Sequence, residues 1–145
     1  MTELHYACMD TSKAWIARAC VAFNFDDINT STDGGLTPLH YACRYGDVEV
    51  AKLLLFSGVE SSLYHYSRWG EIPIDCALRY GKIDTVKLLL SYHEKDKEKA
   101  LVNLGGIFVK AAQRQNLEIV KLIVSINMYV NSFYLVTFSI TIQLN

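Results

Sequence analysis

The sequence predicts an all-α solenoid built from short stacked helix pairs, and three observations lead to this prediction. The phrase "TELHYAC" (Thr2 to Cys8) returns 35 residues later as "TPLHYAC" (Thr37 to Cys43). A second step of 35 reaches "IPIDCALRYG" (72–81), and a step of 34 reaches "GIFVKAAQRQ" (106–115). Each of the last three copies is followed by an apolar run with helical spacing, such as "VEVAKLLLF". A period of this length indicates a repeat protein, in which each unit buries its apolar face on the next.

The first helix of the second copy shows how a unit is expected to begin. Thr37 is placed to cap the helix, and Pro38 stands at the first helical position, where its missing N–H costs nothing. This helix should end at Gly46. Ile72 replaces the threonine in the third copy, and the fourth copy has lost both cap and proline at Gly106. Those two helix starts should therefore be weaker, by about 1 kcal/mol each.

The second helix is predicted from Val48 to Ser57, with its apolar residues inward and Lys52 outward. Gly58 follows as a left-handed C-terminal cap. Neither helix of the pair is long enough to be stable alone. The next copy must therefore cover their joint apolar face.

The second copy resembles the ankyrin repeat, whose pattern G-x-T-P-L-H-x-A-x-x-x-G followed by E-V-x-K-L-L-L-x-x-G it keeps nearly in full. The resemblance implies helix-turn-helix units joined by β-hairpin or loop fingers. It covers residues 1–131 as four repeats, at about 1–32, 33–66, 67–103 and 104–131. The motif residues to which it gives a structural role are Thr37, Pro38, Leu39, His40, Gly46, Gly58, Pro73 and Gly81.

Two histidine and cysteine pairs raise the alternative of a four-ligand metal site. They are His5 with Cys8 and His40 with Cys43. Equivalent residues of stacked repeats lie ~8–10 Å apart, whereas zinc ligands lie within ~2.3 Å of the ion. The third copy also has Asp75 at the histidine position. We therefore expect no metal. The resemblance implies instead that the histidine joins neighbouring loops by hydrogen bonds and that a small residue at the cysteine position packs in the core.

Composition narrows the class of partner and the compartment. Charged residues make up 20% of the chain and the net charge is -1, so neither nucleic acid nor an anionic membrane is expected as a partner. Four cysteines without a CxxC pair favour reduced thiols inside the cell, in the cytoplasm first and the nucleus second. No secretory signal opens the sequence. "DGG" (33–35) lacks the Gly-Lys-Ser/Thr of a phosphate loop, and we expect neither a cofactor nor enzyme activity.

The resemblance implies that a partner protein lies in the concave groove formed by the finger tips and the first helices. The candidate residues are Arg44, Tyr45, Arg79, Tyr80, Gln113 and Arg114 on the helices, and Asp33, Leu36, Arg68, Trp69 and Glu71 at the tips. Arginine, tyrosine and tryptophan dominate the energetics of interfaces. The finger "LYHYSRWGE" (63–71) is expected to bring four rings and a cation to one tip, with self-packing against the neighbouring finger as the alternative.

The expected function is a non-catalytic protein-protein interaction module, an adaptor or regulatory subunit that is monomeric. Two alternatives stay open: a stoichiometric inhibitor of a partner enzyme, and a cytoplasmic fragment of a larger receptor, channel or multidomain protein.

Two segments depart from the repeat. The charge run "HEKDKEKALVN" (93–103) is expected to be a solvated loop or a helix extension. Residues 132–145, "SFYLVTFSITIQLN", alternate apolar and polar residues as strands do. Three interpretations of this tail stay open: a cap on the last repeat, the start of a membrane segment, which its polar residues disfavour, and an artefactual or aggregation-prone end.

Overall fold

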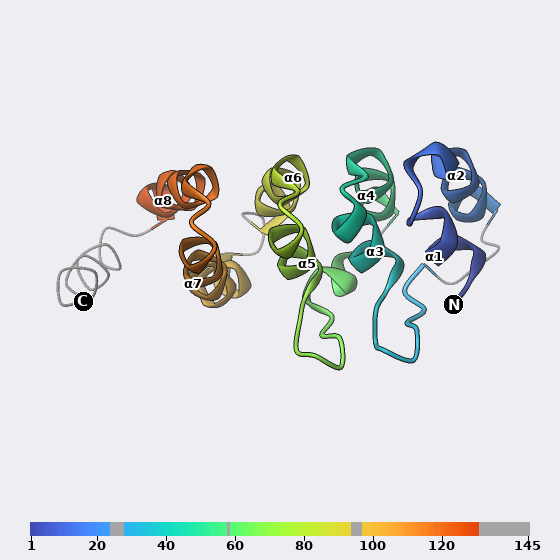
Figure 1. Cartoon of the computed structure of the whole chain (residues 1–145), viewed down its shortest axis with the longest axis horizontal. Helices are drawn as coiled ribbons and strands as arrows, with labels where there is room; N and C mark the ends of the chain where they lie inside the picture. The colour runs from blue at the N-terminus through green and yellow to red at the C-terminus, as the bar shows by residue number, and fades with distance from the viewer. Residues whose placement is uncertain (24–27, 58, 94–96, 131–145) are drawn as a thin grey trace. The chain divides into compact units, whose positions relative to one another are not determined.

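The computed structural model of the chain consists of helices joined by loops and turns (Figure 1). It describes residues 1–23, 28–57, 59–93 and 97–130, and within these ranges no strand is assigned. Contacts divide the chain into two compact units, Met1–Ala100 and Leu101–Asn145. Gly58 and the tail 132–145 lie outside the described residues, so the expectations for them stay predictions.

Among its described residues, the first unit contains three helix pairs and two short 3-10 helices. The elements are α1 (Glu3–Ala7), η1 (Thr11–Lys13), α2 (Ala14–Phe23), α3 (Pro38–Tyr45), α4 (Val48–Phe56), η2 (Val59–Tyr64), α5 (Pro73–Arg79) and α6 (Ile83–His93). The first helices α1, α3 and α5 pack side by side, and α2, α4 and α6 form a second layer against them (Figure 1). This arrangement is the predicted helical solenoid.

The core of the first unit lies between these two layers. Leu39 of α3, Leu54 of α4, Ile74 of α5 and Leu89 of α6 are all buried. Fully burying a side chain of this size stabilises the fold by about 2 kcal/mol. The apolar face of α4 is buried as expected except at Leu53, which is half-exposed, and α4 ends one residue earlier than predicted.

The helix boundaries at Thr37, Pro38 and Gly46 are confirmed, since α3 starts at the proline and ends before the glycine. Gly46 and Gly81 both have positive φ, at 80° and 65°. The residue after each glycine donates its N–H to the carbonyl five positions back, at 3.0 and 2.8 Å. This left-handed turn satisfies carbonyl groups at the helix end and turns the chain into the second helix.

The second unit is formed mainly by α7 (Lys97–Gln113) and α8 (Leu117–Val130). The predicted helix start at Gly106 is wrong, because α7 is already helical from Lys97 and continues through that glycine. No proline or capping residue stands at Gly106 to stop it, and a glycine inside a helix costs only about 1 kcal/mol. The charge run is thus a helix extension from Lys97 onward.

The buried side chains of the second unit stand at repeat positions that are also buried in the first. They include Ile107 and Ala111 of α7, and Ile119 and Ile123 of α8. Ala112, the counterpart of the buried Cys8 and Cys43, is exposed. The packing of a small residue at this position is therefore confirmed for the first two copies and wrong for the fourth.

Gln115 offers a test of the turn between α7 and α8. It has φ 55° at the repeat position that Gly46 and Gly81 occupy. A side chain in this conformation costs ~1–2 kcal/mol, and glycine returns about half of that as unfolded-state entropy. We expect Gln115→Gly to raise the free energy of unfolding by about 0.5–1 kcal/mol, measured by urea titration of the full chain. Gln115→Ala keeps the Cβ atom and should give no gain; equal stabilisation by both variants would contradict the explanation.

Candidate functional site

Two hydrogen-bonded fingers precede α3 and α5. Within them, the N–H of Thr32 bonds to the carbonyl of Leu36 at 2.9 Å and that of Ser67 to the carbonyl of Glu71 at 2.8 Å. The fingers are joined to each other where the N–H of Arg68 donates to the carbonyl of Gly34 at 2.9 Å. The loops are therefore a connected backbone framework and not independent segments.

The repeat histidines fasten each first helix to the finger that follows. In both His5 and His40, Nδ1 accepts the N–H of the threonine three residues earlier at 3.1 Å. The hydrogen on Nε2 then points to the carbonyl of Leu36 or Glu71, at 3.1 Å in each case. The role that the resemblance implied is confirmed. Protein atoms engage both nitrogens of each ring, and the described residues contain no cluster of three or more metal-binding side chains.

The first helix of the third repeat begins without the threonine and the histidine that the first two repeats use. Ile72 offers no capping hydroxyl, as expected, but Asp75 at the histidine position accepts the N–H of Ile72 on Oδ2 at 3.2 Å. The carboxylate thus accepts the N–H that the histidine Nδ1 accepts in the first two repeats. Sequence reasoning missed this role, although aspartate at the third helical position is a known signal of such a contact.

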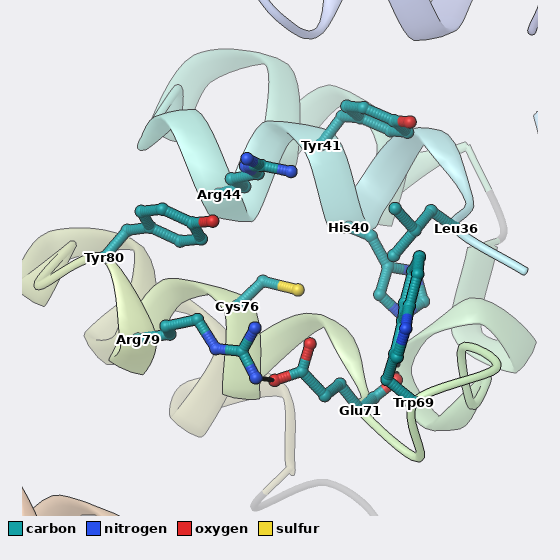
Figure 2. Close-up of a pocket in the computed structure, with 9 residues that line it drawn as sticks. All are labelled: Leu36, His40, Tyr41, Arg44, Trp69, Glu71, Cys76, Arg79 and Tyr80. Atoms are coloured by element: carbon teal, nitrogen blue, oxygen red, sulfur yellow. Dashed lines mark hydrogen bonds and ion pairs between the residues drawn. The ribbon is translucent and has the colours of Figure 1, made fainter. Parts of the chain in front are cut away.

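A pocket of about 270 Å³ opens between α3, α5 and the two fingers (Figure 2). Its lining residues are Leu36, His40, Tyr41, Arg44, Trp69, Glu71, Cys76, Arg79 and Tyr80. Six of these were candidates from the sequence: Leu36, Arg44, Trp69, Glu71, Arg79 and Tyr80. Tyr41 and Cys76 were missed, yet they occupy the same position in successive repeats, so the period itself could have found them.

The two arginines of the pocket differ in their ion-pair partners. The guanidinium of Arg79 pairs with the carboxylate of Glu71 across the pocket floor (Figure 2). Arg44 has no carboxylate partner in the part of the chain that the structure describes. Its guanidinium carbon lies 4.8 Å from the ring centroid of Tyr80 and 5.8 Å from that of Tyr45. Cation-π attraction of this kind is worth about 0.5–1 kcal/mol near the surface.

Two other groups in the pocket wall, His40 and Cys76, are neutral at pH 7. Burial lowers the pKa of His40 from 6.5 to about 4, because the charged ring would lose its hydration. Burial also raises the pKa of the Cys76 thiol to about 11, and the nearby Glu71 carboxylate acts in the same direction. With Arg79 balanced by Glu71, Arg44 is the uncompensated charge among the lining residues.

The remaining candidates fall outside this pocket. Tyr45 is exposed at the end of α3, and Asp33 and Arg68 are exposed on the fingers. Gln113 and Arg114 are exposed and belong to the second unit. The structure therefore brings together part of the candidate set, and the binding role of all of them stays a prediction.

The finger 63–71 only partly matches expectation. Leu63 is buried within η2, and the His65 ring packs edge-on against His40 with centroids 6.1 Å apart, so these residues do not reach the tip. Tyr66 and Trp69 are exposed. A Cβ atom on Gly34 would lie 2.9 Å from the Trp69 ring, so this indole packs against the neighbouring finger. The arrangement thus combines self-packing with exposed aromatic surface.

Repeated helix pairs, left-handed turns and histidine-fastened fingers define a helical-repeat protein. The family model for ankyrin repeats (3 copies) matches residues 1–64, which identifies ankyrin repeats in this part of the chain. Ankyrin repeats are generally protein-protein interaction modules and are typically non-catalytic. No curated protein matches the chain. Across the described residues, every helix is too short or too polar to span a bilayer.

Proposed function

We propose that this chain is a non-catalytic adaptor or regulatory subunit that binds a partner protein through the groove between α3, α5 and their fingers. The observation that carries the proposal is the convergence of Arg44, Trp69, Arg79 and Tyr80 around one pocket (Figure 2). Arginine, tryptophan and tyrosine are the residues that most often supply the binding energy of an interface.

The rigidity of the groove supports the same proposal. Two finger backbones are hydrogen-bonded together, and the His40 ring fixes the second finger to α3. The ion pair of Arg79 with Glu71 and the contact of Trp69 with Gly34 restrain the side chains. Because these groups are already ordered, binding loses less conformational entropy.

The proposed domain is residues 1–131, with α7 and α8 as the helix pair of the fourth repeat. We place the protein inside the cell as a monomer. Support for the compartment comes from the four cysteines, which are all buried and not joined in disulfides, and which suit a reducing environment.

The test is affinity capture from a native lysate of the source cells with three forms of the full chain. The groove variant combines Arg44→Ala, Trp69→Ala and Tyr80→Ala. Its matched control changes Trp15, Arg18 and Phe56 to alanine on α2 and α4, and the two tryptophans have equal exposure of 67%. We expect the wild type and the control to retain the same partner and the groove variant to lose it. Equal capture by all three folded proteins would contradict the groove assignment.

A further inference from the structure

We infer that the pocket between α3 and α5 recognises an aspartate or glutamate side chain of the partner protein, with Arg44 as its counterion. This inference rests on the proposed function, because it names the chemistry that the groove would bind.

The charges of the pocket wall favour a negatively charged ligand. The pocket wall carries two arginines and one carboxylate, and the ion pair joins Arg79 to Glu71. His40 and Cys76 add no charge at neutral pH, since burial holds one ring unprotonated and one thiol protonated. A carboxylate brought to Arg44 would therefore complete the charge balance of the site.

The position of Arg44 also suits it to bind a carboxylate. Its side chain is half-buried, and its guanidinium lies beside the ring of Tyr80 instead of extending into solvent (Figure 2). A guanidinium restrained in this way presents its planar donors at the pocket rim with little further loss of entropy. Partial burial also weakens solvent screening, which strengthens an ion pair formed there.

The pocket walls also provide apolar surface beside Arg44. Leu36, Tyr41 and Trp69 supply apolar surface next to the charged end. A volume of about 270 Å³ is sufficient for one acidic side chain and part of its neighbour in the partner chain. The site therefore favours an acidic residue flanked by an apolar or aromatic one over an isolated acidic stretch.

The test uses random short peptides displayed on phage and selected on the immobilised full-length wild-type chain. We expect the selected peptides to be enriched in aspartate or glutamate at one position relative to the starting library. One such peptide is then synthesised with its acidic residue and with the corresponding amide. Both peptides are titrated against the wild type, Arg44→Gln, Arg44→Lys and Trp69→Ala, and against Arg18→Gln on α2 as the matched control.

Losing either partner of the pair should weaken binding by about tenfold or more. The amide peptide should bind the wild type more weakly than the acidic peptide does. The two peptides should bind Arg44→Gln equally, because this variant has already lost the ion pair. Arg44→Lys should keep a preference for the acidic peptide, and this second variant also serves if Arg44→Gln does not fold. Arg18→Gln should bind as the wild type does.

The outcomes separate this inference from the proposed function. Peptides that need Trp69 but show no acidic preference would overturn the inference and leave the groove as a binding site. Failure to select any peptide, or binding that no pocket substitution weakens, would overturn both.

Discussion

Replacing His40 by leucine is expected to lower the free energy of unfolding by about 3 kcal/mol. The ring is 1% exposed and makes hydrogen bonds at both nitrogens, to the N–H of Thr37 and the carbonyl of Glu71. Leucine fills much of the same space but leaves both backbone groups without this partner. Each unsatisfied buried group costs about 1–3 kcal/mol. Urea unfolding of the full chain measures the loss.

Two matched variants show whether hydrogen bonding is the cause. His5→Leu removes the same set of contacts one repeat earlier, but Thr2 is half-exposed and water can reach its N–H. Its cost should therefore be smaller. His40→Gln can still accept the N–H of Thr37, as glutamine does in a capping box, and should recover part of the loss. Equal losses in His40→Gln and His40→Leu would show that packing, not hydrogen bonding, sets the effect.

Stability is also expected to fall on mild acidification because of the same ring. The pKa of His40 is lowered from 6.5 to about 4 in the folded state, chiefly by burial. Between these two pH values the unfolded chain takes up a proton that the folded chain excludes, so acid favours unfolding. The contribution of His40 is intact above its unfolded pKa and is lost as pH falls towards its folded pKa. From about pH 7 to about pH 5 the loss should be about 2 kcal/mol.

The pH experiment compares wild type with His40→Leu at both pH values. Carboxylates titrate in both proteins, so only the difference between the two pH dependences belongs to His40. The wild type should lose about 2 kcal/mol more than the variant on acidification. Parallel stability curves would contradict a buried neutral histidine at this position.

Features that depend on residues close in sequence were predictable. The N-cap position of Thr37, the proline after it and the left-handed turn at Gly46 each follow from local backbone chemistry, and the structure has all three. The fastening role of His40 came from the family resemblance, since its partner carbonyl lies 31 residues away. The helix start at Gly106 was mispredicted because the repeat alignment marked a boundary where no stop signal exists.

The candidate site was only partly predictable for a related reason. Period and residue type pointed to Arg44, Tyr80, Trp69 and Glu71, and the structure places these four around one pocket. Neither period nor residue type indicates which charges pair, and the match of Arg79 with Glu71 depends on side-chain conformations across α5 and its finger.

The sequence by itself determined that this protein is a stack of helix pairs, because a repeated pattern of caps, glycines and apolar residues allows each unit to bury its face only on the next. Only the tertiary structure decided that Arg44 remains without a carboxylate partner among the described residues while Arg79 acquires one. That difference arises from distances between side chains of neighbouring repeats, which the order of residues along the chain does not specify. It is the difference on which the proposed recognition of an acidic side chain depends.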